Sequence, residues 1–241
     1  MVSSIQCRYR ALGDLPTDRQ AAQEWLSRAE LATWQAMRSP LRQATWLAGR
    51  VLAKQLLRTY RVDLPGEQAI GPPTEIHIES RSVARRLGAR PAIFVSGQAL
   101  DWGLSIAHSG RGVLVAVAVG ANLSVGVDLV SSEECRAPSL AWCFSAAERR
   151  WLASLPAHGR GAERLWAMKE AVFKACQVGE GFAPQRIEID PDALDPSAAS
   201  PAVRRLQCWR VDSHVAALAI ANRPATSKTI TPRTVEREHH D

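Results

Sequence analysis

Two apolar runs in the middle of the chain constrain its fold most strongly. Residues 113–119 form an unbroken run of apolar, mainly β-branched side chains, which is typical of a strand covered on both faces. A turn-forming segment, 120–122, separates it from a second strand-like run at 124–130. The second run carries one carboxylate, Asp128, and burying an isolated ionised group in an apolar surround is strongly unfavourable. Asp128 therefore either faces solvent at the strand end or lies beside a cation.

A second carboxylate, Glu170, lies in a predicted helix further along the chain. Trp166, Glu170 and Lys174 follow one another at intervals of four, so their side chains share one helix face, whereas Lys169 points elsewhere and is expected to be structural. An exposed Glu170–Lys174 ion pair, which adds little stability, is the simpler interpretation of that helix alone. Together with Asp128, however, Glu170 offers hard oxygen ligands that suit Mg²⁺ bound with a phosphate. The two segments indicate phosphate chemistry.

Composition narrows the class of protein. The 241 residues are enough for one large domain or two smaller ones. The net charge of +6 and the isoelectric point near 9.4 predict an anionic partner, without choosing among nucleic acid, acidic membranes, an acidic protein and a polyanionic cofactor. No apolar run approaches the roughly 20 residues that cross a bilayer, and no secretory signal is recognisable, so a cytoplasmic location is expected. The five scattered cysteines predict reduced thiols rather than a disulfide framework.

The order of predicted elements suggests a repeat. Helices are expected over residues 17–34, from Pro40 to about residue 60, after a capping box at 145–148, and around Trp166. Short strands are expected at 76–78 and 187–189, and a closing hairpin over 206–221. Helices followed by strands, twice over, predict an α/β (α+β) fold of two similar halves in a pseudo-twofold arrangement, each a small sheet packed with helices. The expected boundaries are residues 1–122, 123–222 and a disordered tail at 223–241.

Two further residues are candidates for binding phosphate. His108 precedes the buried run 113–119 and stands between two serines, so its imidazole and nearby backbone N–H groups suit a phosphate, although a turn histidine without a ligand is the simpler interpretation. Arg90 lies in a Gly-Ala-Arg-Pro turn and offers a bidentate contact. Each residue is a weak signal alone, but their order along the chain is informative.

That order resembles the 4'-phosphopantetheinyl transferases of the longer, two-halved kind, which act on carrier proteins of polyketide, peptide and siderophore synthesis. The resemblance covers roughly residues 20–221. Its most specific part is three motifs in the right order and at the right spacing. All the matching segments are 47–52, Gly88-Ala89-Arg90-Pro91, 106–109, Gly126-Val127-Asp128-Leu129, 144–148 and 166–174.

The resemblance implies a reaction and roles for the matching residues. Members move the phosphopantetheine arm of coenzyme A onto a serine of an apo acyl or peptidyl carrier protein and release adenosine 3',5'-bisphosphate. Asp128 and Glu170 would bind Mg²⁺ at the coenzyme A pyrophosphate, and Lys174 would neutralise the departing phosphate. Glu170 would also act as base for the serine hydroxyl. His108 and Arg90 would hold phosphate oxygens of coenzyme A.

Three positions depart from the resemblance. Val130 stands where many relatives carry a second acid, Ala107 where serine is frequent, and Thr45 where relatives often carry an arginine for coenzyme A. Arg50 and Arg42 are nearby substitutes for that arginine, and Arg50 is taken as the candidate coenzyme A contact.

The resemblance implies a monomer whose partners are coenzyme A and an acidic carrier protein, without nucleic acid or membrane. The three departures motivate an alternative, a carrier-binding relative that keeps the fold without turnover. Nucleic-acid binding through the basic segment 81–90 ranks last, because no recognition helix or aromatic stacking motif accompanies it.

Overall fold

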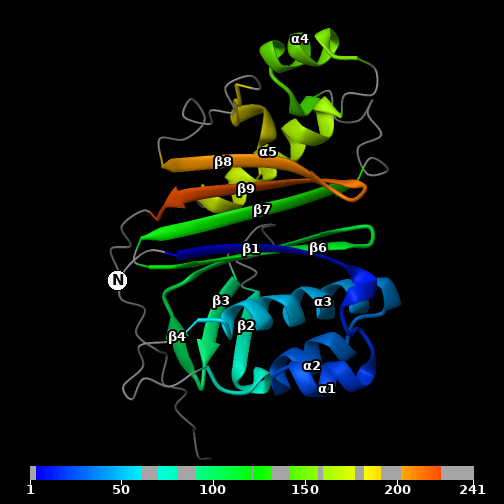
Figure 1. The fold of residues 1–241 in the computed structure, drawn as a ribbon, viewed down its shortest axis with the longest axis vertical. Coiled ribbons are helices and arrows are strands. Elements are labelled where there is room, and N and C mark those ends of the chain that lie inside the picture. The colour runs from blue at the N-terminus through cyan, green and yellow to red at the C-terminus, as the bar shows by residue number, and fades with distance from the viewer. Residues whose placement is uncertain are drawn as a thin grey trace, which may run out of the picture.

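The computed structural model of the chain describes residues 4–60, 70–80, 91–120, 122–131, 142–156, 160–176, 182–190 and 202–223. Within these residues it contains three small antiparallel sheets and five α-helices arranged in layers (Figure 1). The predicted mixed α and β fold class is confirmed. The tail from residue 224, the connection at residue 121 and the turn that contains Arg90 lie outside the described residues.

Along the chain, α1 to α3 follow β1, and α4 and α5 lie between β7 and β8. The α-helices are α1 (Arg19–Trp25), α2 (Arg28–Gln35), α3 (Pro40–Leu57), α4 (Ala146–Ser154) and α5 (Gly161–Cys176). The strands are β1 (Ser4–Ala11), β2 (Ile76–Ser80), β3 (Pro91–Val95), β4 (Gln98–Leu100), β5 (Gly103–Ser109), β6 (Gly112–Val119), β7 (Leu123–Ser131), β8 (Val203–Val211) and β9 (His214–Asn222). Short 3-10 helices are η1 (Leu12–Asp14), η2 (Pro73–Glu75) and η4 (Pro184–Arg186).

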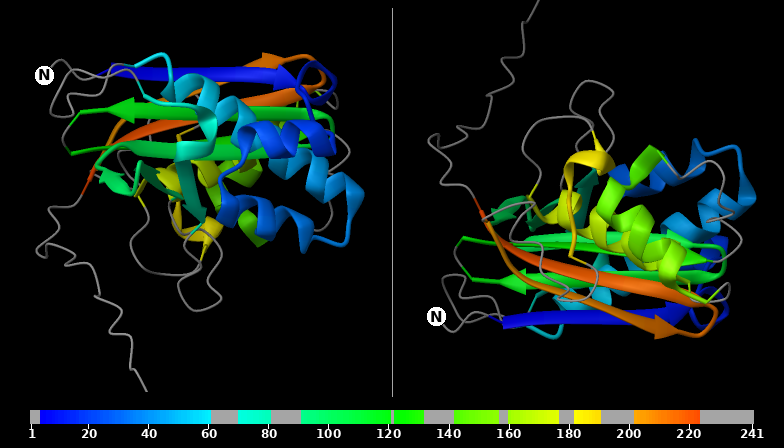
Figure 2. Two further views of the ribbon diagram at one scale, coloured as in Figure 1. Left: turned by 90° about the horizontal axis from the view of Figure 1, so that it is seen from below. Right: turned by 90° about the horizontal axis from the view of Figure 1, so that it is seen from above.

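Two of the sheets have the same strand order. The first sheet has the strand order β1-β6-β5, and the second has the order β7-β9-β8. In each sheet the middle strand comes last in the sequence, and it lies between the strand that comes first and the strand that directly precedes it. Helix α3 packs on the first of these sheets and α5 on the second, so the helices lie on opposite outer faces (Figures 1 and 2). The third sheet, β2-β3-β4, belongs to the N-terminal part. The expected boundaries at residues 122 and 222 remain a prediction.

The inner faces of the two matching sheets enclose an apolar layer. Alternate residues of β5, β6, β7 and β9 fill it with alanine, valine, leucine and isoleucine side chains. Strands β5 and β7 run beside one another, and the hydroxyl of Ser105 accepts the Val127 N–H at 3.0 Å. Two polar contacts add to this layer near the β8–β9 turn: His214 Nε2 lies 2.9 Å from the Ser109 carbonyl oxygen, and the Tyr9 hydroxyl donates to Asp212 at 2.8 Å.

Two predicted elements differ from the structure. The single helix expected over 17–34 is two helices, because Ser27 breaks it and caps α2. The strand expected at 187–189 is irregular, because its backbone groups bind side chains instead of a neighbouring strand. The Ile189 N–H donates to Glu148, and the Ile187 carbonyl accepts from Lys169. Strand β1 was not predicted, whereas the strands over 113–119 and 124–130 and the closing hairpin are confirmed.

A buried glutamate and lysine organise the N-terminal part. Ser27 and Glu30 form the capping box of α2, in which the Glu30 carboxylate accepts the Ser27 N–H at 2.9 Å. The same carboxylate accepts the Ile78 N–H of β2 at 3.2 Å and an N–H from Lys54 of α3. Lys54 also donates to the Pro73 carbonyl at 3.0 Å, so one ion pair joins two helices, a strand and η2.

The C-terminal part repeats the main contacts of this cluster. Ser145 and Glu148 form the capping box of α4, and the Glu148 carboxylate accepts the Ile189 N–H at 3.1 Å. Lys169 of α5 lies 2.8 Å from the same carboxylate and donates to the Pro184 carbonyl at 3.0 Å. Glu148 and Lys169 are 1% and 0% exposed, so the pair is shielded from water. This pair fixes α5 against the elements around it.

Each buried pair should be essential for stability. Removing one partner of a buried ion pair leaves the other charge uncompensated and costs about 3–5 kcal/mol. We expect Glu148→Gln and Glu30→Gln each to lower the free energy of unfolding by that amount in urea titrations. The matched control is Glu24→Gln on α1, whose side chain is exposed and whose replacement should change stability little. Equal stability of the three variants would contradict a structural role for the pairs.

Gly126 should tolerate no side chain. A Cβ atom built there would lie 2.0 Å from the Ala171 carbonyl oxygen and 2.5 Å from the Ala175 nitrogen, both backbone atoms of α5. Rotamer changes cannot relieve a backbone clash, so Gly126→Ala should destabilise the protein by about 3 kcal/mol or displace α5. Gly13→Ala is the control, because nothing lies within 4 Å of its Cβ position. Thermal melts that shift equally for both variants would contradict this prediction.

Candidate active site

Strand β7 presents Asp128 toward helix α5. Along β7, Val127 and Leu129 face the apolar layer between the sheets, so the alternating positions, which include Gly126 and Asp128, face α5. Asp128 pairs with Ala217 of the middle strand β9 and is 8% exposed. The strand can approach α5 closely because Gly126 has no side chain there. The aspartate is thus held at a well-defined, nearly buried position.

Helix α5 brings Glu170 and Lys174 to the same place. The Lys174 Nζ lies 2.7 Å from Asp128 Oδ1 and 3.5 Å from Glu170 Oε2. The helix is oriented by Lys169, which is anchored on the opposite side, and by the Ser124 hydroxyl, which donates to the Ala175 carbonyl at 2.6 Å. The structure therefore brings together three of the predicted site residues, Asp128, Glu170 and Lys174, in one cluster.

The electrostatics of this cluster favour additional positive charge. Burial raises the pKa of Asp128 to about 6; Lys174 opposes that shift and the negative charge of Glu170 adds to it. Burial tends to lower the pKa of Lys174, but Asp128 and Glu170 outweigh it and the pKa is raised. Two carboxylates thus share a single ammonium group. A cation beside Asp128 would stabilise its ionised form.

The donor set fits a magnesium ion that keeps several water ligands. Carboxylate oxygens are the ligands that Mg²⁺ prefers, and one or two protein carboxylates with substrate phosphates are a common set. Val130, on the same strand face, is 3% exposed and packs in the core beneath α5, so it supplies no ligand. The part of the chain that the structure describes contains no group of three or more His, Cys, Asp or Glu residues placed to hold a metal. Asp128 and Glu170 are the candidate protein ligands.

Two further candidates lie on other elements, His108 on β5 and Arg50 on α3. His108 is exposed near the end of β5, and its neighbour Ala107 is buried in the apolar layer. Arg50 is 4% exposed in α3, where its Nε lies 3.4 Å from Glu30 and its guanidinium lies over Trp46 at 4.4 Å. Burial lowers the pKa of Arg50 to about 10, with Glu30 opposing. A contact between Arg50 and coenzyme A would require this buried side chain to become accessible, and it stays a prediction.

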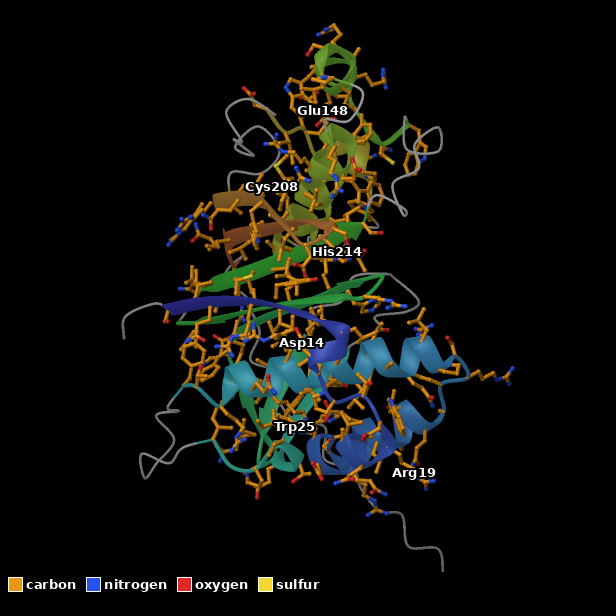
Figure 3. The ribbon with its side chains drawn as sticks, turned by 45° about the vertical axis from the view of Figure 1, so that its right-hand side comes forward. Asp14, Arg19, Trp25, Glu148, Cys208 and His214 are labelled. Atoms are coloured by element: carbon orange, nitrogen blue, oxygen red, sulfur yellow. The ribbon has the colours of Figure 1, made fainter. Side chains whose placement is uncertain are left out.

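Sequence patterns did not reveal the cluster that supports the site. Lys169 was expected to be structural, but its partner Glu148 was recognised only as part of a capping box. The usable signal was the repetition of Ser-x-x-Glu at 27–30 and 145–148, each ahead of a long helix that carries a lysine. In Figure 3 Glu148 lies in α4, toward one end of the molecule, and His214 lies close to the boundary between the two matching sheets.

The comparison with protein families identifies the part of the chain that carries this cluster. Residues 124–221 match the model of the 4'-phosphopantetheinyl transferase superfamily. This segment is similar to members of that superfamily. The matched phosphopantetheinyl transferase segment runs from β7 to β9 and includes Asp128, Glu170 and Lys174. A comparison with curated proteins gave no match to the chain. Among the described helices, none is long and apolar enough to span a membrane.

Removing one carboxylate should weaken metal binding at this candidate site. We expect Mg²⁺ to bind to one site per chain. The Asp128→Asn substitution should lower the Mg²⁺ affinity by at least about tenfold, because one of the two protein ligands loses its charge. Isothermal titration calorimetry measures both affinities. Asp14→Asn, an exposed aspartate of η1, is the matched control and should bind as the parent does. Equal affinity for Asp128→Asn and the parent would remove Asp128 from the metal site.

Proposed function

We propose that the chain transfers the 4'-phosphopantetheine group of coenzyme A to a serine of an acyl or peptidyl carrier protein and releases adenosine 3',5'-bisphosphate. The observation that carries the proposal is the cluster of Asp128, Glu170 and Lys174, at the junction of β7 and α5 inside the matched segment. Phosphoryl transfer depends mainly on positioning and on neutralising phosphate charge, and a cluster of two carboxylates and an ammonium group suits that need.

In this proposal each residue of the cluster has a distinct task. Asp128 and Glu170 would hold Mg²⁺, which would supply charge neutralisation for the phosphates of coenzyme A. Glu170, directly or through a water, accepts the proton of the carrier serine as the serine oxygen bonds to the phosphorus of the pantetheine side. The bond from that phosphorus to the bridging oxygen breaks, and Lys174 neutralises the departing bisphosphate. His108 and Arg90 contact phosphate oxygens of coenzyme A.

The proposed protein partner follows from charge. The chain carries a net charge of +6, so a carrier protein that is acidic around its serine is favoured electrostatically. We propose that the chain acts as a monomer toward this partner. Val130 favours one alternative, a relative that binds carrier proteins without turnover, because its buried side chain replaces an acid that many relatives carry.

A transfer assay tests the proposal directly. Incubation with coenzyme A, Mg²⁺ and a broad panel of apo carrier proteins should add the mass of one phosphopantetheine group to a serine, as seen by mass spectrometry. Asp128→Asn and Glu170→Gln should each lower kcat/KM by about 10²-fold or more, because each removes a metal ligand and Glu170→Gln also removes the base.

The control is again Asp14→Asn, which should transfer at the parent rate. If no carrier protein of the panel is modified, the transfer function is refuted. If carriers bind to the parent and to both site variants alike without modification, the non-catalytic alternative is supported instead.

A further inference from the structure

The ammonium of Lys174 occupies the place between the two candidate metal ligands. Its Nζ approaches Asp128 Oδ1 to 2.7 Å and Glu170 Oε2 to 3.5 Å, so one monovalent cation bridges both carboxylates. A divalent ion bound by the same carboxylates would lie within a few ångströms of this ammonium, where like charges repel strongly. A metal ion coordinated by these two oxygens would therefore compete with the ammonium of Lys174 for them.

We infer that Lys174 is a counter-ion that a divalent metal displaces, and that its ammonium, once displaced from Asp128 and Glu170, binds a phosphate oxygen of the co-substrate. This inference rests on the proposed function, since it concerns the same site. It makes metal binding and anion binding cooperative, because the metal frees the cation that the anion needs. Cooperativity of this kind is reciprocal, so the anion also favours the metal.

Helix α5 carries two lysines, and their environments differ in the way this role requires. Lys169 is 0% exposed and is fixed by Glu148 and by two backbone carbonyls. The side chain of Lys174 is 24% exposed, and its ion pairs are with the two carboxylates of the site. It stands near the solvent boundary on a flexible four-carbon stem, which allows the ammonium to move while the helix stays in place.

Titration calorimetry of Lys174→Met tests the competition. Without coenzyme A, this variant should bind Mg²⁺ at least about fivefold more tightly than the parent, the lower end of typical coupling between sites. With saturating Mg²⁺ and no carrier protein, it should bind coenzyme A at least about fivefold more weakly. Lys174→Arg keeps the charge and should bind Mg²⁺ as the parent does. Arg19→Gln on α1 removes an exposed charge elsewhere and is the control.

A second measurement uses the parent protein, so it does not depend on the folding of a variant. Reductive methylation followed by mass spectrometry should label Lys174 faster after Mg²⁺ is added, while Lys169, buried in both states, stays protected. Unchanged labelling of Lys174 would overturn the inference. Equal or weaker Mg²⁺ affinity of Lys174→Met, or equal affinities of the Met and Arg variants, would overturn it as well.

The outcomes separate the inference from the proposed function. If the metal and coenzyme A affinities change as expected but no carrier protein accepts the group, the transfer function fails and the role of Lys174 stands. If transfer proceeds while the Mg²⁺ affinity of Lys174→Met equals that of the parent, the transfer function stands and the displaced counter-ion fails.

Discussion

The buried ion pair between Glu148 and Lys169 is the interaction on which the rest of the site depends. Its carboxylate closes the cap of α4 and binds the backbone at Ile189, and its ammonium anchors α5 to the segment around Pro184. Because Glu170 follows Lys169 directly in α5, fixing one side chain sets the rotation of the helix at the other. The position of Glu170 and Lys174 is therefore decided on the opposite, buried side of the same helix.

The N-terminal part contains the same support without the same chemistry. Lys54 and Glu30 reproduce the buried pair, but the residue after Lys54 is Gln55, where Glu170 follows Lys169. On β1 the side chain that meets the end of α3 is Gln6, which accepts from Thr59 at 3.2 Å. One architecture thus occurs twice, and only one copy combines two carboxylates with an ammonium among the residues described. Stability and chemistry are separable in this fold, since the supporting cluster persists where the reactive groups are absent.

Local patterns predicted part of the fold and of the candidate site. An unbroken apolar run after a turn placed the strand that carries Asp128, and spacing of four placed Glu170 and Lys174 on one helix face, because both patterns follow from the local backbone. The partnership of Glu148 with Lys169 leaves no such period, since it joins residues that only the folded chain brings together. The break in the helix at Ser27 was not predicted, because the apolar spacing continues through it. Residues 187–189 have the sequence pattern of a strand, but their backbone groups form hydrogen bonds with side chains.

The apolar layer between the two matching sheets has a further consequence. Each sheet has a face that water would solvate poorly, and each covers that face with the other sheet. The two parts therefore gain most of their mutual attraction from an extended dry contact, reinforced at the β8–β9 turn by His214 and Tyr9. Cohesion between the two sheets comes from this layer. Either sheet, separated from the other, would expose this apolar face to water.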